Sequence, residues 1–117
     1  MAKVDEILIE NNNSKNLEML IDLLRRVKEE LSGDGFDILG IFGSYSRSEQ
    51  NPDSDIDILY ELNKDFLTKY PGFKGIDKLD QIQNLLHALL NVHPDTVRRS
   101  SLPAQIRERI ERELVSV

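Results

Sequence analysis

The sequence contains no cysteine, so it can form neither a disulfide framework nor a thiolate metal site. This absence is compatible with the reducing cytoplasm, which is the location we expect. Long hydrophobic runs are also missing, because no apolar stretch approaches the roughly 18 residues that a membrane-spanning helix needs. Residues 1–10 place acidic side chains within a short apolar stretch, which is not the pattern of a secretory signal. We therefore expect no membrane association.

Concentrated basic charge is scarce as well. The formal net charge is −6, and the basic residues gather only at Arg98 and Arg99 and in the last predicted helix. Because neutralisation of nucleic-acid phosphates needs concentrated basic charge, we expect no direct contact with nucleic acid. A nucleotide bound by so acidic a domain would be held through metal and backbone groups.

The hydrophobic content of 39% and charged content of 31% are those of one globular domain over residues 1–117. Apolar spacing predicts helices at 16–31, 76–90 and 102–114, the last with Arg and Glu on its outer face. An apolar run between turn signals predicts a strand at 36–42, alternation until Leu59 predicts one at 55–62, and a short β-type run predicts one at 92–97, with Pro94 at an edge or a strand start. Polar stretches predict a loop or a helix entrance at 11–13, one or two helical turns at 44–50, a turn at 51–54 and a long connection at 63–75. This order indicates an α/β fold.

Three aspartates, Asp53, Asp55 and Asp57, alternate where the second predicted strand begins. Side chains alternate across a strand, so Asp55 and Asp57 share one face with Cα atoms about 6.6 Å apart. Unpaired, their charges repel by on the order of 2–3 kcal/mol at an effective dielectric near 20. Mg²⁺ or Mn²⁺ would remove that repulsion and carry a phosphate. The alternative is that these are solvated turn carboxylates, which we favour for Asp53 because it follows Pro52.

A calcium-binding EF-hand loop also begins with alternating acidic positions. Such a loop needs glycine at its sixth position and glutamate at its twelfth. Here those positions are Ile58 and Lys64, so the sequence excludes a calcium loop of this kind.

Gly43 and Ser44 form a tight turn at the end of the first predicted strand. A turn that leads into a helix exposes backbone N–H groups that bind phosphate. The Ser44 hydroxyl can donate to a phosphate oxygen, and Arg47 could add a charge-assisted contact. No Gly-Lys-Ser/Thr follows, so this is not a Walker loop. Alone, these residues would indicate an ordinary strand-to-helix turn, but the aspartates downstream favour phosphate binding.

The two halves together form a known signature. Gly-Ser at 43–44, ten further residues and Asp-x-Asp at 55–57 closely resemble the nucleotidyltransferases of the DNA polymerase β type. The pattern Gly-Ser-x-x-Arg followed by Ser-Asp-Ile-Asp is most similar to their minimal nucleotidyltransferase branch. Ser48 departs from that branch, which usually carries glycine there. The resemblance implies a polymerase β-like fold, with a small mixed β-sheet flanked by helices.

The resemblance also implies a third carboxylate on a neighbouring strand, and Asp95 matches its place. Its neighbours Pro94 and Thr96 replace apolar residues of the family pattern, and the alternative is that Asp95 is a turn residue. Adjacent strands lie about 4.8 Å apart, so Asp95 could reach the same metals. By resemblance, Asp55, Asp57 and Asp95 would hold two Mg²⁺ ions, with Mn²⁺ as a substitute. Asp95 would also help to activate the acceptor hydroxyl.

Three ring side chains near this predicted site have no firm role. His93 lies near Asp95 in the sequence and could touch substrate, but we do not assign it. His87 is expected to be a packing or surface residue of its helix. Tyr45 is either a site contact or a surface aromatic.

The resemblance implies transfer of a nucleoside monophosphate, AMP from ATP, although no residue reads the base recognisably. Little of the sequence lies outside the predicted core, so we expect the acceptor to be on another polypeptide. Minimal members look like antitoxins that AMPylate a HEPN-domain toxin, and this is the leading hypothesis. Two alternatives stay open. One is a non-catalytic module that neutralises a partner by contact, and the other is an aminoglycoside-type transferase that builds its acceptor pocket by forming a homodimer.

Overall fold

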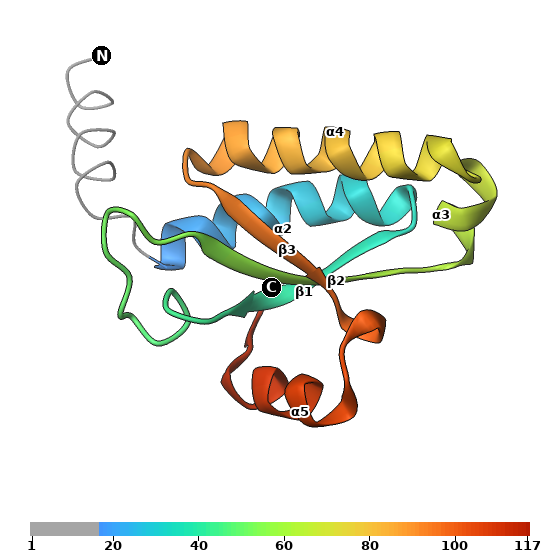
Figure 1. Cartoon of the computed structure of the whole chain (residues 1–117). Coiled ribbons are helices and arrows are strands. Elements are labelled where there is room, and N and C mark those ends of the chain that lie inside the picture. The colour runs from blue at the N-terminus through green and yellow to red at the C-terminus, as the bar shows by residue number, and fades with distance from the viewer. Residues whose placement is uncertain (1–16) are drawn as a thin grey trace, which may run out of the picture.

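The first long helix and the first strand form where the apolar spacing predicts them. The computed structural model describes residues 17–117, so the loop or helix entrance predicted at residues 11–13 lies outside the described residues. Helix α2 spans Leu17–Gly33 and strand β1 spans Phe36–Phe42 (Figure 1). The helix buries one stripe of side chains, as expected for residues spaced three and four apart: Leu20, Leu24, Val27 and Leu31.

The sheet is mixed and has the strand order β3-β2-β1-β4. Strands β2 (Ile56–Leu62) and β3 (Pro94–Arg98) run parallel, whereas β1 is antiparallel to both β2 and β4 (Val115–Ser116). Strand β3 lies at a sheet edge and begins at Pro94, which confirms the predicted place of that proline. Strand β4 was not predicted, because two residues cannot show an alternating pattern.

Two long helices lie together on one face of the sheet. Helix α4 spans Phe73–Leu90, so it begins three residues before the predicted start, and it packs beside α2 (Figure 1). Helix α5, Ala104–Glu113, lies below the sheet in this view and contacts β1. It follows a short 3₁₀ turn, Arg99–Ser101. No residue of α5 is buried, so its apolar repeat covers the sheet only partly.

The predicted connection at 63–75 contains a short helix that the sequence analysis missed. Helix α3 spans Lys64–Lys69, and the Asn63 side chain caps it by accepting from the N–H groups of Asp65 at 2.9 Å and Phe66 at 3.4 Å. The ring of Phe66 is buried. A helix of six residues with one buried side chain shows no periodicity, which is why the pattern predicted a loop.

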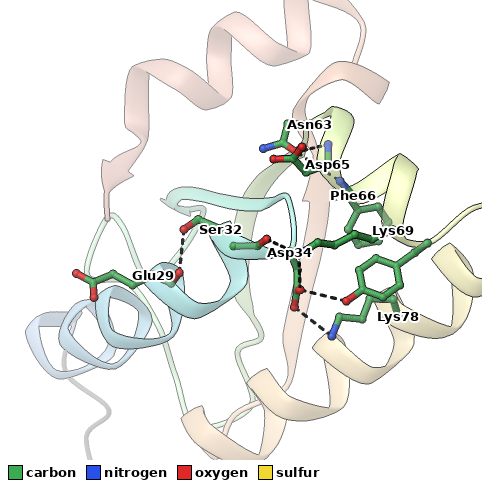
Figure 2. A network of polar contacts seen from close by, with 10 residues as sticks. Glu29, Ser32, Asp34, Asn63, Asp65, Phe66, Lys69 and Lys78 are labelled. Atoms are coloured by element: carbon green, nitrogen blue, oxygen red, sulfur yellow. Dashed lines mark hydrogen bonds and ion pairs between the residues drawn. The ribbon is translucent and has the colours of Figure 1, made fainter.

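A polar cluster ties α3 and α4 to the end of α2 (Figure 2). The Asp34 carboxylate accepts from the Tyr70 hydroxyl at 3.1 Å and pairs with Lys78 at 3.3 Å and Lys69 at 3.5 Å. Burial raises the pKa of Asp34, but hydrogen bonds from Lys78 and Tyr70 outweigh it and leave that pKa below its usual value. The cluster lies at the start of β1, so it supports the end of the sheet away from the predicted aspartates. Within residues 17–117, no helix is both long and apolar enough to cross a bilayer.

Candidate active site

The strand register brings the predicted aspartates to one end of the sheet. Asp57 of β2 lies directly beside Asp95 of β3, and Phe42, the last residue of β1, lies opposite Asp57. Asp55 is exposed just before β2. The flanking residues Ile56 and Ile58 are buried in the core. Because side chains alternate along a strand, the Asp57 carboxylate points to the opposite face from the core beneath α2 and α4.

Negative charge accumulates around Asp57. Burial, the charge of Asp95 and a hydrogen bond between these two side chains raise the pKa of Asp57 to about 6. The charges of Asp55 and Glu113 are smaller contributions to the same rise. A carboxyl group whose ionisation is disfavoured by several acidic neighbours is typical of a place where a cation or a proton is handled.

The side chains at this end of the sheet fit a divalent cation that arrives with a phosphate. Among residues 17–117, no three acidic or histidine side chains converge into a ready-made metal cage. Mg²⁺ does not require such a cage, because it commonly takes one or two carboxylates and completes its shell with water and substrate phosphates. Asp57 and Asp95, side by side with Asp55 near them, supply hard oxygen ligands of this kind.

Position 43 requires a glycine for two reasons, which are its backbone conformation and the close approach of the Asp57 carboxylate. Its φ angle is +75°, in the left-handed region that favours glycine. A Cβ atom added at Gly43 would lie 2.1 Å from Oδ2 of Asp57. The absence of a side chain at this turn therefore leaves room for the Asp57 carboxylate.

The stretch after Gly43 is not the helical segment that the sequence predicts. It consists of consecutive turns, in which the N–H of Arg47 donates to the Gly43 carbonyl at 3.3 Å and that of Glu49 to the Ser44 carbonyl at 2.8 Å. The argument from a helix N-terminus is therefore wrong here. The turn nevertheless presents anion-binding donors, because the Gly43 N–H and the Arg47 guanidinium both donate to the Glu113 carboxylate.

Comparison with known proteins assigns this chain to a family. Residues 20–117 match the model of the nucleotidyltransferase domain. The chain belongs to the nucleotidyltransferase domain family. It is 34% identical to the protein adenylyltransferase MntA of Thermococcus cleftensis, over 86% of this chain and 95% of that protein. It is 30% identical to MJ0126 of Methanocaldococcus jannaschii, also assigned as a protein adenylyltransferase, over 88% of this chain and 99% of that protein.

A solved structure supports the same family. It is assigned as a minimal nucleotidyltransferase and superposes with a TM-score of 0.67 at 26% identity, covering 87% of this chain and 96% of that one. The predicted membership of the minimal branch, the α/β fold with a small mixed sheet, and the identification as a nucleotidyltransferase are thereby confirmed.

Ser48, which departs from the usual sequence of the minimal nucleotidyltransferases, keeps the backbone shape of a glycine. Its φ angle is +56°, in the left-handed region. A side chain in that conformation costs roughly 1 kcal/mol relative to glycine. The turn thus survives the substitution at some cost in stability.

We predict that Ser48→Gly raises the free energy of unfolding by about 0.5–1 kcal/mol, because it relieves this strain. Urea denaturation of the purified protein measures the change. The matched control is Ser46→Gly, because Ser46 lies in the same turn without a positive φ and its hydroxyl donates to the Gly43 carbonyl at 2.7 Å. That variant is expected to lose stability, and a loss in Ser48→Gly as well would contradict the prediction.

The two neighbours of Asp95 that differ from the family pattern, Pro94 and Thr96, have local structural roles. Pro94 is buried at the strand start, where a missing N–H breaks no ladder hydrogen bond. The Thr96 hydroxyl donates to the Gln83 side chain of α4 at 3.0 Å, and the Gln83 amide donates to the Pro94 carbonyl. These contacts fasten β3 to α4 and hold Asp95 in register with Asp57, so the predicted alternative of a turn residue is wrong.

The ring side chains and Asp53 lie at definite places around this site. Nδ1 of His93 is 3.5 Å from Oδ1 of Asp55, and the exposed ring of His87 meets that of His93 edge-on at 5.6 Å. Tyr45 is buried, which excludes a surface aromatic, and burial together with the Asp55 charge raises the pKa of its hydroxyl. Asp53 is exposed in a turn, as predicted, with its N–H donating to the Asn51 side chain at 2.9 Å.

Glu113 is the site residue that sequence reasoning missed. The apolar repeat of the last helix predicts its acidic side chains on the outer face. In the structure the Glu113 carboxylate reaches back 70 residues to the Gly43 turn. No sequence pattern links the two positions, so only the packing of α5 against β1 reveals the contact.

Proposed function

We propose that this nucleotidyltransferase transfers AMP from ATP to a hydroxyl group of a partner protein, with Mg²⁺ as the cation and Mn²⁺ as a substitute. The observation that carries the proposal is the register of Asp57 beside Asp95, with the Gly43 turn closing over the Asp57 carboxylate. The names of the relatives, which are protein adenylyltransferases, support a protein as the acceptor.

Each side chain has a role in this reaction. Asp55, Asp57 and Asp95 would hold the divalent cations, which neutralise the triphosphate and the charge that develops during transfer. Gly43, Ser44 and Arg47, the second group of predicted site residues, would bind the phosphates of the leaving group through the backbone N–H, the hydroxyl and the guanidinium.

The acceptor oxygen attacks the α-phosphorus of ATP, and the bond between that phosphorus and the bridging oxygen to the β-phosphate breaks. Pyrophosphate leaves in line with the attacking oxygen. The proton of the acceptor hydroxyl passes to the Asp95 carboxylate, which is exposed at the edge strand where a protein acceptor can reach it.

The partner we propose is a HEPN-domain toxin, and the chain would act as its antitoxin in the cytoplasm. This finer assignment rests on the resemblance of the minimal branch to such antitoxins. The non-catalytic alternative makes the opposite prediction for the aspartates, because neutralisation by contact alone would not need them.

The test is transfer of label from α-phosphate-labelled ATP, in the presence of Mg²⁺, to the product of the adjacent gene. We expect label on the partner with the wild-type protein. We expect Asp55→Asn to lower the rate by at least about 100-fold, because metal ligation contributes several kcal/mol to transition-state stabilisation. Asp53→Asn is the matched control and should keep the wild-type rate, since Asp53 lies in the solvated turn.

Two results would count against the proposal. Wild-type protein that leaves the partner unlabelled would exclude it as the acceptor. An Asp55→Asn variant that still neutralises the partner in cells would favour the contact-only module instead.

A further inference from the structure

Glu113 occupies two of the three donors that the proposed reaction assigns to phosphate. Its Oε1 atom accepts from the Gly43 N–H at 3.0 Å, and its Oε2 atom accepts from Nη1 of Arg47 at 2.9 Å. A carboxylate and a phosphate make the same kind of contact with a backbone amide and a guanidinium. Since 30% of the Glu113 side chain is exposed, a dissolved anion can reach this position.

The position of Glu113 is electrostatically unfavourable in two respects. It is the last residue of α5, and the C-terminal end of a helix disfavours negative charge. Its charge also adds to those of Asp95 and Asp55 in raising the pKa of Asp57. The contacts with Gly43 and Arg47 offset these penalties, so a more highly charged anion would compete well for the same donors.

We propose that Glu113 is a surrogate anion, which fills the phosphate-binding turn before nucleotide binds and is displaced by the incoming triphosphate. The inference rests on the proposed function, because it takes Gly43 and Arg47 as phosphate donors. Glu113 directly precedes the segment that pairs with β1, where Val115 and Ser116 lie opposite Ile41 and Gly40. Displacement of Glu113 therefore loosens the C-terminal strand as the triphosphate binds.

The experiment measures binding of inorganic tripolyphosphate with Mg²⁺ by titration calorimetry. Glu113→Gln keeps the shape of the side chain but removes its charge, so we expect it to bind tripolyphosphate about 5-fold more tightly than wild type. Glu111→Gln is the matched control, because Glu111 lies on the same helix but pairs with Arg99. It should bind as the wild type does. Equal or weaker binding by Glu113→Gln would overturn the proposal and show that Glu113 only stabilises the turn.

A second measurement uses only the wild-type protein, so it does not depend on the folding of the variant. Saturating Mg²⁺-tripolyphosphate should speed amide exchange in β4 and at Val117, whose N–H donates to the Leu39 carbonyl at 3.3 Å. Unchanged exchange there would overturn the proposal. Neither measurement requires an acceptor or AMP transfer. If the transfer assay failed but Glu113→Gln bound tripolyphosphate more tightly, the proposed function would be refuted and the role of Glu113 as a surrogate anion would stand.

Discussion

Asp57→Asn is expected to lower nucleotidyl transfer severely and, at the same time, to stabilise the metal-free protein. Asp57 is charged at pH 7 although burial and its acidic neighbours raise its pKa from 3.8 to about 6. The neutral amide removes this repulsion, and for a half-buried, solvent-screened group we expect a gain of about 1 kcal/mol in the free energy of unfolding. Transfer should fall on the order of 1000-fold, because the amide is a poor ligand for Mg²⁺.

The raised pKa of Asp57 also predicts the direction in which the stability of the protein changes with pH. Between about pH 4 and pH 6 the native state binds more protons at Asp57 than the unfolded state, because its pKa is raised on folding. The contribution of Asp57 therefore lowers stability as pH rises through that window, and it is fully unfavourable above about pH 6. Urea denaturation in EDTA from pH 4 to pH 8 should show a more negative slope of stability against pH in wild type than in Asp57→Asn, and the difference between the two slopes is the contribution of Asp57.

The matched control is Asp53→Asn, because it removes an acidic charge from the exposed turn in the same stretch. It should leave both transfer and the pH slope as in wild type. A less stable Asp57→Asn variant at pH 7 would contradict the prediction, and so would one that retains the wild-type slope.

The parts of the fold that could be predicted are those with enough residues to show a period. Helix α2 buries a stripe at helical spacing, and strands β1 and β2 are seven-residue segments rich in buried apolar side chains, so all three are visible in the sequence. Helix α3 and strand β4 are too short for any period, and local contacts define them instead. For α3 these are the Asn63 cap and the buried Phe66.

The site divides in the same way. Asp55 and Asp57 follow from strand alternation, and a family pattern was needed to add Asp95, whose strand pairs with β2 across more than thirty residues of sequence. The donors at Gly43 and Arg47 were predicted from the residue types, but the helix that was expected to create them did not form. The contact with Glu113 depends on how α5 packs against β1, and this packing cannot be inferred from the local sequence.

Gly43→Ala is the second change for which we expect a large effect, because the added methyl group would clash with the Asp57 carboxylate. The new Cβ would lie 2.1 Å from Oδ2 and 3.0 Å from Cγ of Asp57, so the carboxylate must move. A displaced carboxylate would no longer lie where the proposed reaction needs it to hold metal beside Asp95, and we expect transfer to fall by at least about 100-fold. Alanine at φ +75° adds backbone strain of about 1 kcal/mol.

A double-mutant cycle separates the clash from the backbone strain. In an Asp57→Ala background the Asp57 carboxylate is absent, so Gly43→Ala should cost only the backbone term of about 1 kcal/mol. In the wild-type background it should cost measurably more, and the difference is the free energy of the contact. Gly33→Ala is the control, because nothing lies within 4 Å of its added Cβ and it should leave transfer unchanged. Equal costs in the two backgrounds, with normal transfer by Gly43→Ala, would show that the turn does not position Asp57.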